Sequence, residues 1–171
     1  YLSAKIKKIK KIKMLFSGLP FLYYFLPAVL VCYFAAPRKL KNAVFFVFSL
    51  IFYGWGEPRY IVLMIVSIVS GFVFALMIEK KQNKKSGLIL MWISVAVSLS
   101  FLLIFKYADF LIENVNQLPG VSLPLSKLSL PIGISFYTFQ IISYTVDVWR
   151  GDTKAQRNII SFGTYVSLFP Q

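Results

Sequence analysis

The side chains best able to take part in chemistry gather near the C-terminal end of the chain, in a stretch that is otherwise apolar. Gln140, Ser143 and Asp147 recur at spacings of three and four residues, which places an amide, a hydroxyl and a carboxylate on one face of a helix. Tyr144 adds a phenol on a neighbouring face. Because polar groups are costly to expose to lipid, we expect this face to turn toward other helices or a watery cavity.

Two hypotheses stay open for this polar face. In the functional hypothesis it forms the wall of a substrate tunnel. In the structural hypothesis the same groups form hydrogen bonds between helices, and the residues alone slightly favour this, because Ser, Thr and Gln commonly join helices without contacting a ligand. The candidate tunnel residues are Ser135, Gln140, Tyr144 and Asp147.

Several kinds of active site are excluded by residues that the sequence lacks. The chain has no histidine and a single cysteine, so it can assemble neither a histidine-dependent catalytic triad nor a metal site built from histidine and cysteine. The acidic residues lie at the ends of apolar stretches or in polar connections, where they form no proton relay inside a membrane. We therefore assign no catalytic residue and no metal ligand within this chain.

The elements that must position these side chains are long apolar stretches. Of the 171 residues, 58% are hydrophobic and only 15% are charged, unlike the composition of a soluble domain. A helix needs about 20 residues to cross a bilayer, and the stretches lack the alternation of a barrel strand. They predict an all-α, multi-pass transmembrane protein, with the second stretch tilted or partly inserted and the last one continuing to the end of the sequence. The uncharged stretches are residues 14–37, 42–56, 60–78, 86–105, 128–146 and 158–171.

The net charge of +13 is confined to the connections between these stretches, which does not indicate a nucleic-acid-binding surface. Connections 37–41, 79–85 and 150–157 hold more Lys and Arg than the two between them. The positive-inside rule therefore places these three connections in the cytoplasm. Connection 106–127 is then external, and it has room for a short interfacial helix at residues 110–115.

Residues 1–13 conflict with this orientation, because they would place six lysines outside the membrane. We interpret them as a basic extension upstream of a natural start at Met14, and we expect them to be dispensable. The alternative is an amphipathic arm on anionic lipid, with Ile6, Ile9 and Ile12 at helical spacing.

Residues 130–151, LPIGISFYTFQIISYTVDVWRG, resemble the signature of the membrane-bound O-acyltransferases. The resemblance is to the bacterial branch that contains alginate O-acetyltransferases and the D-alanyl transfer protein of teichoic acid modification. Shorter matches are MLFSGLPFLYYFLP from Met14, FYGWGEP at residues 52–58 and SLFPQ at residues 167–171. The resemblance covers residues 14–171 and implies that they are the N-terminal portion of such a domain, with the family's catalytic histidine beyond residue 171.

This resemblance also implies a fold, substrates and partners. The fold is a ring of tilted helices around a tunnel, in the inner membrane of a bacterium. The donor is an activated acyl group such as a thioester, which arrives from the cytoplasmic side, free or on a carrier protein, and no cofactor stays bound. The acceptor is an exported polysaccharide such as alginate, handled with periplasmic acetylation proteins, and the isolated chain should be inactive.

Other functions stay open beside this one. Within the same family, the acyl group could be D-alanyl or another group transferred to cell-wall polymers. Outside it, the chain could be half of a membrane transporter, with the polar face lining a permeation path, or a purely structural membrane subunit.

Overall fold

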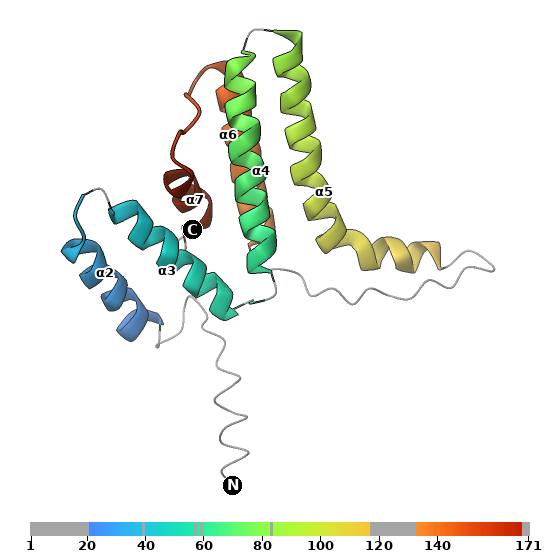
Figure 1. Cartoon of the computed structure of the whole chain (residues 1–171). Coiled ribbons are helices and arrows are strands. Elements are labelled where there is room, and N and C mark those ends of the chain that lie inside the picture. Colours follow the sequence, from blue (N-terminus) through green and yellow to red (C-terminus); the bar gives the residue numbers. More distant parts are fainter. Residues whose placement is uncertain are drawn as a thin grey trace.

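The computed structural model describes residues 21–38, 40–56, 58, 60–82, 84–116 and 133–168, which form helices joined by short connections (Figure 1). No strand occurs in this described part of the chain, so the prediction of an all-α fold is confirmed. The elements in chain order are the π-helical turn η1 (Phe21–Phe25), α2 (Leu26–Ala35), α3 (Lys41–Gly56), α4 (Ile61–Lys80), α5 (Lys85–Val115), α6 (Ile134–Arg150) and α7 (Ile159–Ser167).

Helix α4 is the central element, packed against α5, α6 and α7. Its small residues allow close approach: a Cβ added at Gly71 would lie 2.6 Å from Cγ2 of Ile141 on α6. Ile141 and Phe162 of α7 are almost fully buried in the core that these helices share. Helix α3 packs on α7, and α2 packs on α3 as an outer layer (Figure 1).

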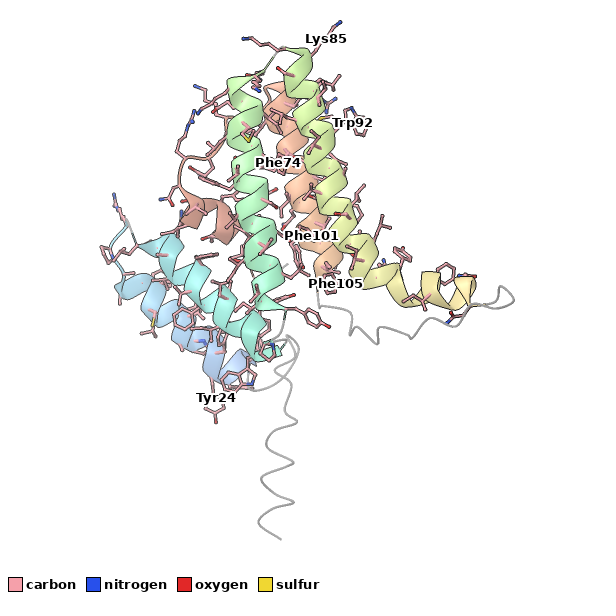
Figure 2. All side chains as sticks on the ribbon, turned by 45° about the vertical axis from the view of Figure 1, so that its right-hand side comes forward. Tyr24, Phe74, Lys85, Trp92, Phe101 and Phe105 are labelled. Atoms are coloured by element: carbon pink, nitrogen blue, oxygen red, sulfur yellow. The ribbon has the colours of Figure 1, made fainter. Side chains whose placement is uncertain are left out.

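The outer surface of the bundle is apolar, as its core is. Helix α4 and residues Lys85–Tyr107 of α5 are each long and apolar enough to cross a membrane, with mean hydropathies of 2.9 and 2.6. Val62 of α4 and Ile89 and Trp92 of α5 are large apolar side chains that face outward, and Figure 2 shows Trp92 on the outer side of its helix. A surface of this kind suits contact with lipid, which fits an all-α membrane fold.

Helix α5 is longer than one bilayer crossing. Its 31 residues measure about 46 Å at 1.5 Å per residue, against a hydrocarbon core of about 30 Å. Beyond its apolar part the helix bends away from α4 and α6 (Figure 1). The short interfacial helix expected at residues 110–115 is therefore the end of α5 and not a separate element.

The last apolar stretch forms a short packed helix as far as the described residues reach. Helix α7 has nine residues, about 14 Å, which is too short to cross a bilayer. Its side chains bind the start of α3 instead. The Thr164 hydroxyl donates to the carbonyl of Asn42 at 2.9 Å, and the Asn42 amide donates to the hydroxyl of Ser161 at 3.0 Å.

Two of the three basic connections predicted for the cytoplasm lie together at one end of the bundle. The α4–α5 and α6–α7 connections meet there, while the α3–α4 connection lies at the opposite end (Figure 1). Arg157 and Glu79 join the two through an ion pair of 2.6 Å. This arrangement agrees with the predicted alternation of the loops, whereas the side of the membrane stays a prediction. The expectations for residues 1–20, 117–132 and 169–171, which include the natural start at Met14, lie outside the described residues.

Candidate functional site

Helix α6 carries the four candidate tunnel residues, and glycines bound it at both ends. Gly133 before its first turn and Gly151 after its last turn have φ angles of 77° and 86°, a left-handed conformation that favours glycine. Between them the helix buries one face in the bundle. The buried residues are Ile134, Tyr137, Thr138, Ile141, Thr145 and Val148.

The polar face predicted from the sequence lies beside this buried face. Phe136, at its start, is 71% exposed and Ser143 is exposed, while Gln140 and Asp147 are half-buried. The described residues therefore cover this face only in part, because the side-chain oxygen of Gln140 is buried while Phe136 and Ser143 are exposed. The exposed part is open to a substrate, as the tunnel hypothesis requires, or to further helices, as the structural hypothesis requires.

The four candidate residues do not all line the same cavity. Ser135 lies near the start of α6, about 18 Å from Asp147 along a helix that rises 1.5 Å per residue. Tyr144 and Asp147 come together in a cavity of about 360 Å³ that does not include Ser135 or Gln140. The remaining walls of this cavity, called the tyrosine cavity below, are Thr153, Gln156, Ser161, Phe162 and Tyr165.

Tyr144 joins the three segments that build the tyrosine cavity. Its ring packs against Phe162 of α7, with 4.9 Å between the ring centroids, and lies 6.2 Å from the ring of Tyr165. Its hydroxyl oxygen accepts a hydrogen bond of 2.6 Å from the backbone N–H of Gln156 in the α6–α7 connection. One side chain of α6 therefore positions both the connection and α7.

Glu79 holds the same connection from the end of α4. One of its carboxylate oxygens accepts the backbone N–H of Ala155 at 3.1 Å, and the other pairs with Arg157 at 2.6 Å. The amide oxygen of Gln156 in turn accepts the N–H groups of Arg157 and Asn158. Side chains thus accept hydrogen bonds from backbone N–H groups that would otherwise bind water. These bonds fix the shape of the α6–α7 connection, which forms one wall of the tyrosine cavity.

Most of these contributors could not be found from the sequence. Glu79 lies 78 residues before Arg157, and nothing in its position at the end of an apolar stretch indicates the pair. Gln156 belongs to a polar connection and Ser161 to an apolar stretch, and no sequence motif marks either residue. Tyr144 was the one feature of the sequence that indicated such contacts, because a phenol near the end of an apolar helix needs a hydrogen-bond partner.

The tyrosine cavity has the chemistry of a binding site. Its hydroxyls, amide and Asp147 carboxylate can donate to or accept from polar groups of a ligand, and its rings supply apolar contact. Within the described residues, no group of three or more His, Cys, Asp and Glu side chains could hold a metal ion. The cavity holds no histidine, and its polar groups and rings can bind and orient a reactant.

Comparison with known proteins relates the chain to O-acetyltransferases. It is 36% identical over 168 residues to a "Probable alginate O-acetylase" of Pseudomonas aeruginosa, and 36% identical over 162 residues to the protein of that name from Pseudomonas syringae pv. tomato. Each match covers 92% of this chain and 31% of the relative. The chain is also 30% identical over 154 residues, 87% of its length, to 29% of a "Peptidoglycan O-acetyltransferase" of Helicobacter pylori.

The chain thus spans about a third of the length of the curated relatives that it matches. No family model matches it, and no solved structure matches it. The similarity nevertheless extends over nearly all of the chain and so includes much more than one motif. The predicted resemblance of this chain to the alginate O-acetyltransferase branch of the membrane-bound O-acyltransferases is thereby confirmed.

Proposed function

We propose that the whole protein transfers an acetyl group from an activated donor to hydroxyl groups of an exported polysaccharide, with alginate as the first candidate. The observation that carries this proposal is the similarity over 92% of the chain to proteins named as probable alginate O-acetylases. The Helicobacter pylori relative is named for another glycan, but its name describes the same transfer to oxygen. O-acetylation of a glycan is therefore the common chemistry.

The proposed reaction needs a general base, and the resemblance to the family assigns that role to a histidine. With a thioester donor, the acceptor hydroxyl oxygen attacks the acetyl carbonyl carbon, the carbon–sulfur bond breaks and an ester bond forms. The hydroxyl proton passes to a general base, and the sulfur leaves as a thiolate that takes up a proton. Since the chain has no histidine, the base expected from the family lies elsewhere in the whole protein.

The described residues would contribute the donor side of the path. The tyrosine cavity lies where α6 ends, next to the basic α6–α7 connection that is predicted to face the cytoplasm. An acyl donor, free or on a carrier protein, would reach this end first. Asp147 and the Tyr144 hydroxyl, which line this cavity, would hold polar groups of the donor, while Gln140 and Ser135 would line the path farther along α6.

With the donor arriving at the cytoplasmic end, the other proposed partners are the lipid bilayer and the components on the opposite side of the membrane. The protein would cross the inner membrane of a bacterium several times, with the bilayer in contact with the apolar outer surface of the bundle. Periplasmic acetylation proteins or the exported polysaccharide itself would act at the opposite end. No bound cofactor and no nucleic acid are required.

Acetylation in cells tests the proposal. In a polysaccharide-producing bacterium that lacks its own O-acetylase, the whole protein should restore ester-linked acetate on the polymer, measured by NMR of the purified polysaccharide. Asp147→Asn removes the charge and keeps the shape. Loss of a charge-assisted hydrogen bond should lower acetylation per folded molecule by about tenfold. Val62→Leu, on the outer side of α4, is the control and should leave acetylation unchanged.

The same experiment separates the alternatives. Acetate on peptidoglycan or another cell-wall polymer, with none on the exported polysaccharide, would favour the cell-wall acceptor that the Helicobacter pylori relative suggests. D-alanyl esters in place of acetate would identify the other acyl group. A whole protein that acetylates no polymer and instead changes the uptake of a solute would replace the proposal with the transporter hypothesis.

A further inference from the structure

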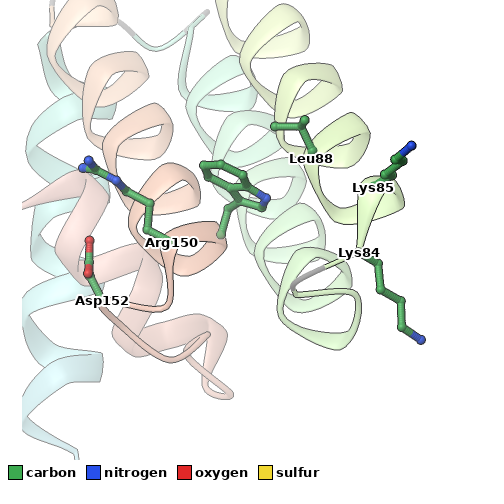
Figure 3. A pocket seen from close by; sticks show the side chains of 6 residues that line it. Lys84, Lys85, Leu88, Arg150 and Asp152 are labelled. Carbon is green, nitrogen blue, oxygen red and sulfur yellow. The ribbon is translucent and has the colours of Figure 1, made fainter.

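A second cavity, of about 860 Å³, lies between the first turn of α5 and the last turn of α6 (Figure 3). It shares no lining residue with the tyrosine cavity. Three of the side chains that line it are cationic and one is acidic. The lining residues are Lys84, Lys85, Leu88, Trp149, Arg150 and Asp152, and the name basic cavity is used for this set below.

Close packing at the helix ends builds the basic cavity. The Gln82 amide in the α4–α5 connection donates to the carbonyl of Val148 at 3.3 Å, which ties this connection to the last turn of α6. Gly151 has a left-handed φ of 86°, which favours glycine, and a Cβ added there would lie 2.5 Å from the Gln82 amide nitrogen and displace it. A Cβ at Gly87 would clash with the carbonyl of Lys81. These contacts hold the start of α5 beside Trp149 and Arg150.

The charges of the basic cavity favour an anion. Lys84, Lys85 and Arg150 provide three positive charges, and the carboxylate of Asp152 offsets one of them. Lys80 and Lys81, at the end of α4, are exposed at the same end of the bundle and add to the local potential. Ammonium and guanidinium groups each donate hydrogen bonds to phosphate oxygens, and Figure 3 shows Lys84 and Lys85 on the α5 side of the cavity and Arg150 with Asp152 on the α6 side.

An apolar strip leads from the basic cavity along α5. Leu88 lines the cavity and is 38% exposed, and Trp92 lies four residues farther along the same face of the helix and is 62% exposed. Ile89, beside them, is 59% exposed. Figure 2 shows Lys85 and Trp92 in succession down α5 from the end of the bundle. The apolar span of α5 begins at Lys85, so the cations lie where lipid headgroups meet hydrocarbon.

We propose that the basic cavity binds the phosphate-bearing headgroup of an anionic phospholipid, with an acyl chain of that lipid lying along Leu88, Ile89 and Trp92. The cations account for a phosphate, and the adjoining strip accounts for a ligand that continues into the bilayer. A soluble anion would make no use of the strip, and an acidic protein would not follow it into the hydrocarbon. The proposal depends on the membrane placement of α5 and is independent of the reaction that the whole protein catalyses.

Lipid retention measured by native mass spectrometry tests this site. The whole protein is reconstituted in nanodiscs of equal parts phosphatidylglycerol and phosphatidylcholine, released, and the retained lipids are counted. We expect preferential retention of phosphatidylglycerol by the wild type. Each basic residue near a membrane surface contributes about fivefold to the binding of anionic lipid, so Lys84→Gln, Lys85→Gln and Arg150→Gln should each reduce the preference several-fold and together abolish it.

A matched control removes the same number of charges outside the cavity. The triple variant Arg38→Gln, Lys41→Gln, Lys154→Gln should keep most of the preference, because none of these side chains lines the basic cavity. Equal retention of both lipids by the wild type, or an equal loss in both triple variants, would overturn the proposal. So would displacement of the retained lipid by inorganic phosphate alone, which would show that a soluble anion suffices.

A second pair of variants tests the acyl-chain strip. Trp92→Ser and Ile89→Ser should shorten the retention of phosphatidylglycerol while leaving the cations in place. Unchanged retention in both would contradict the proposed path of the acyl chain. Circular dichroism of each variant shows that it is folded, so that a loss of lipid can be assigned to the site.

Discussion

At the scale of single residues, Tyr144 carries two functions in one side chain. Its ring is part of the packing with Phe162, and its hydroxyl fixes the α6–α7 connection through the N–H of Gln156. Because these functions belong to different atoms, they can be separated. A substitution can remove the hydroxyl and keep the ring. It then tests how the hydroxyl holds the α6–α7 connection without disturbing the packing of the ring in the bundle.

Tyr144→Phe should loosen the α6–α7 connection without unfolding the bundle. The N–H of Gln156 would lose its acceptor, at a cost of about 1 kcal/mol, while the ring contact with Phe162 remains. Hydrogen exchange should become faster at the amide of Gln156 and stay unchanged in the middle of α4. An unaltered exchange rate at Gln156 would show that this hydrogen bond does not fix the connection.

Gln140 distinguishes the tunnel hypothesis from the structural hypothesis. It is half-buried on the polar face of α6, with its side-chain oxygen enclosed by the protein. Gln140→Leu keeps similar bulk and removes the amide. If this face lines a path for substrate, acetylation per folded molecule should fall several-fold while the unfolding temperature in detergent changes little. Normal acetylation per folded molecule would remove Gln140 from the site, and a large loss of stability alone would support the structural hypothesis.

At the scale of elements, the apolar stretches predicted a helix well where that helix occupies nearly the whole stretch. The stretch at residues 60–78 became α4, Ile61–Lys80, because a long uncharged run can satisfy its backbone only as a helix. The length of α5 and the packing of α7 were not predictable. Polar residues after Tyr107 gave no sign that the same helix continues, and α7 owes its position to contacts with Asn42, far away in the sequence.

In the candidate site too, local features could be predicted from the sequence, whereas contacts between distant segments could not. The spacing along α6 predicted that Tyr144 lies on a face next to that of Asp147, and the two side chains do line one cavity. It could not add Gln156 or Tyr165, which reach the cavity through a connection and a second helix. Ser135, another candidate tunnel residue, lies about 18 Å away from Asp147 along the helix and does not line this cavity.

Helix packing around Gly71 gives a prediction at the same scale. Gly71→Ala should destabilise the bundle by about 1–3 kcal/mol, because the new methyl group would overlap Cγ2 of Ile141 in a closely packed core. Thermal unfolding in detergent measures this loss. Combining Gly71→Ala with Ile141→Ala removes the overlap, so the double variant should be less unstable than the sum of the two single variants. Strict additivity would show that α4 and α6 do not meet at this point.

At the scale of the whole molecule, the two cavities lie at the same end of α6 but have different chemistry. The tyrosine cavity is lined by hydroxyls, an amide and one carboxylate, and the basic cavity carries an excess of cations beside an apolar strip. The basic connections that led to the predicted orientation also build both cavities. The orientation of the bundle in the membrane therefore decides which compartment and which leaflet each cavity meets.

Cysteine labelling of the whole protein tests this orientation. With the natural cysteines replaced, Cys32 included, single cysteines at exposed positions are introduced as Lys81→Cys and Lys154→Cys at the basic end and as Asn114→Cys at the far end of α5. We expect an impermeant maleimide added to intact spheroplasts to label Asn114→Cys, and to reach the other two only after permeabilisation, because basic connections are retained in the cytoplasm. The reverse pattern would place the tyrosine cavity outside the cell, where an acyl donor from the cytoplasm cannot enter it, and the donor role of Asp147 would fail. The basic cavity could still bind phospholipid in that case, but from the outer leaflet of the membrane, so the orientation test separates the two proposals.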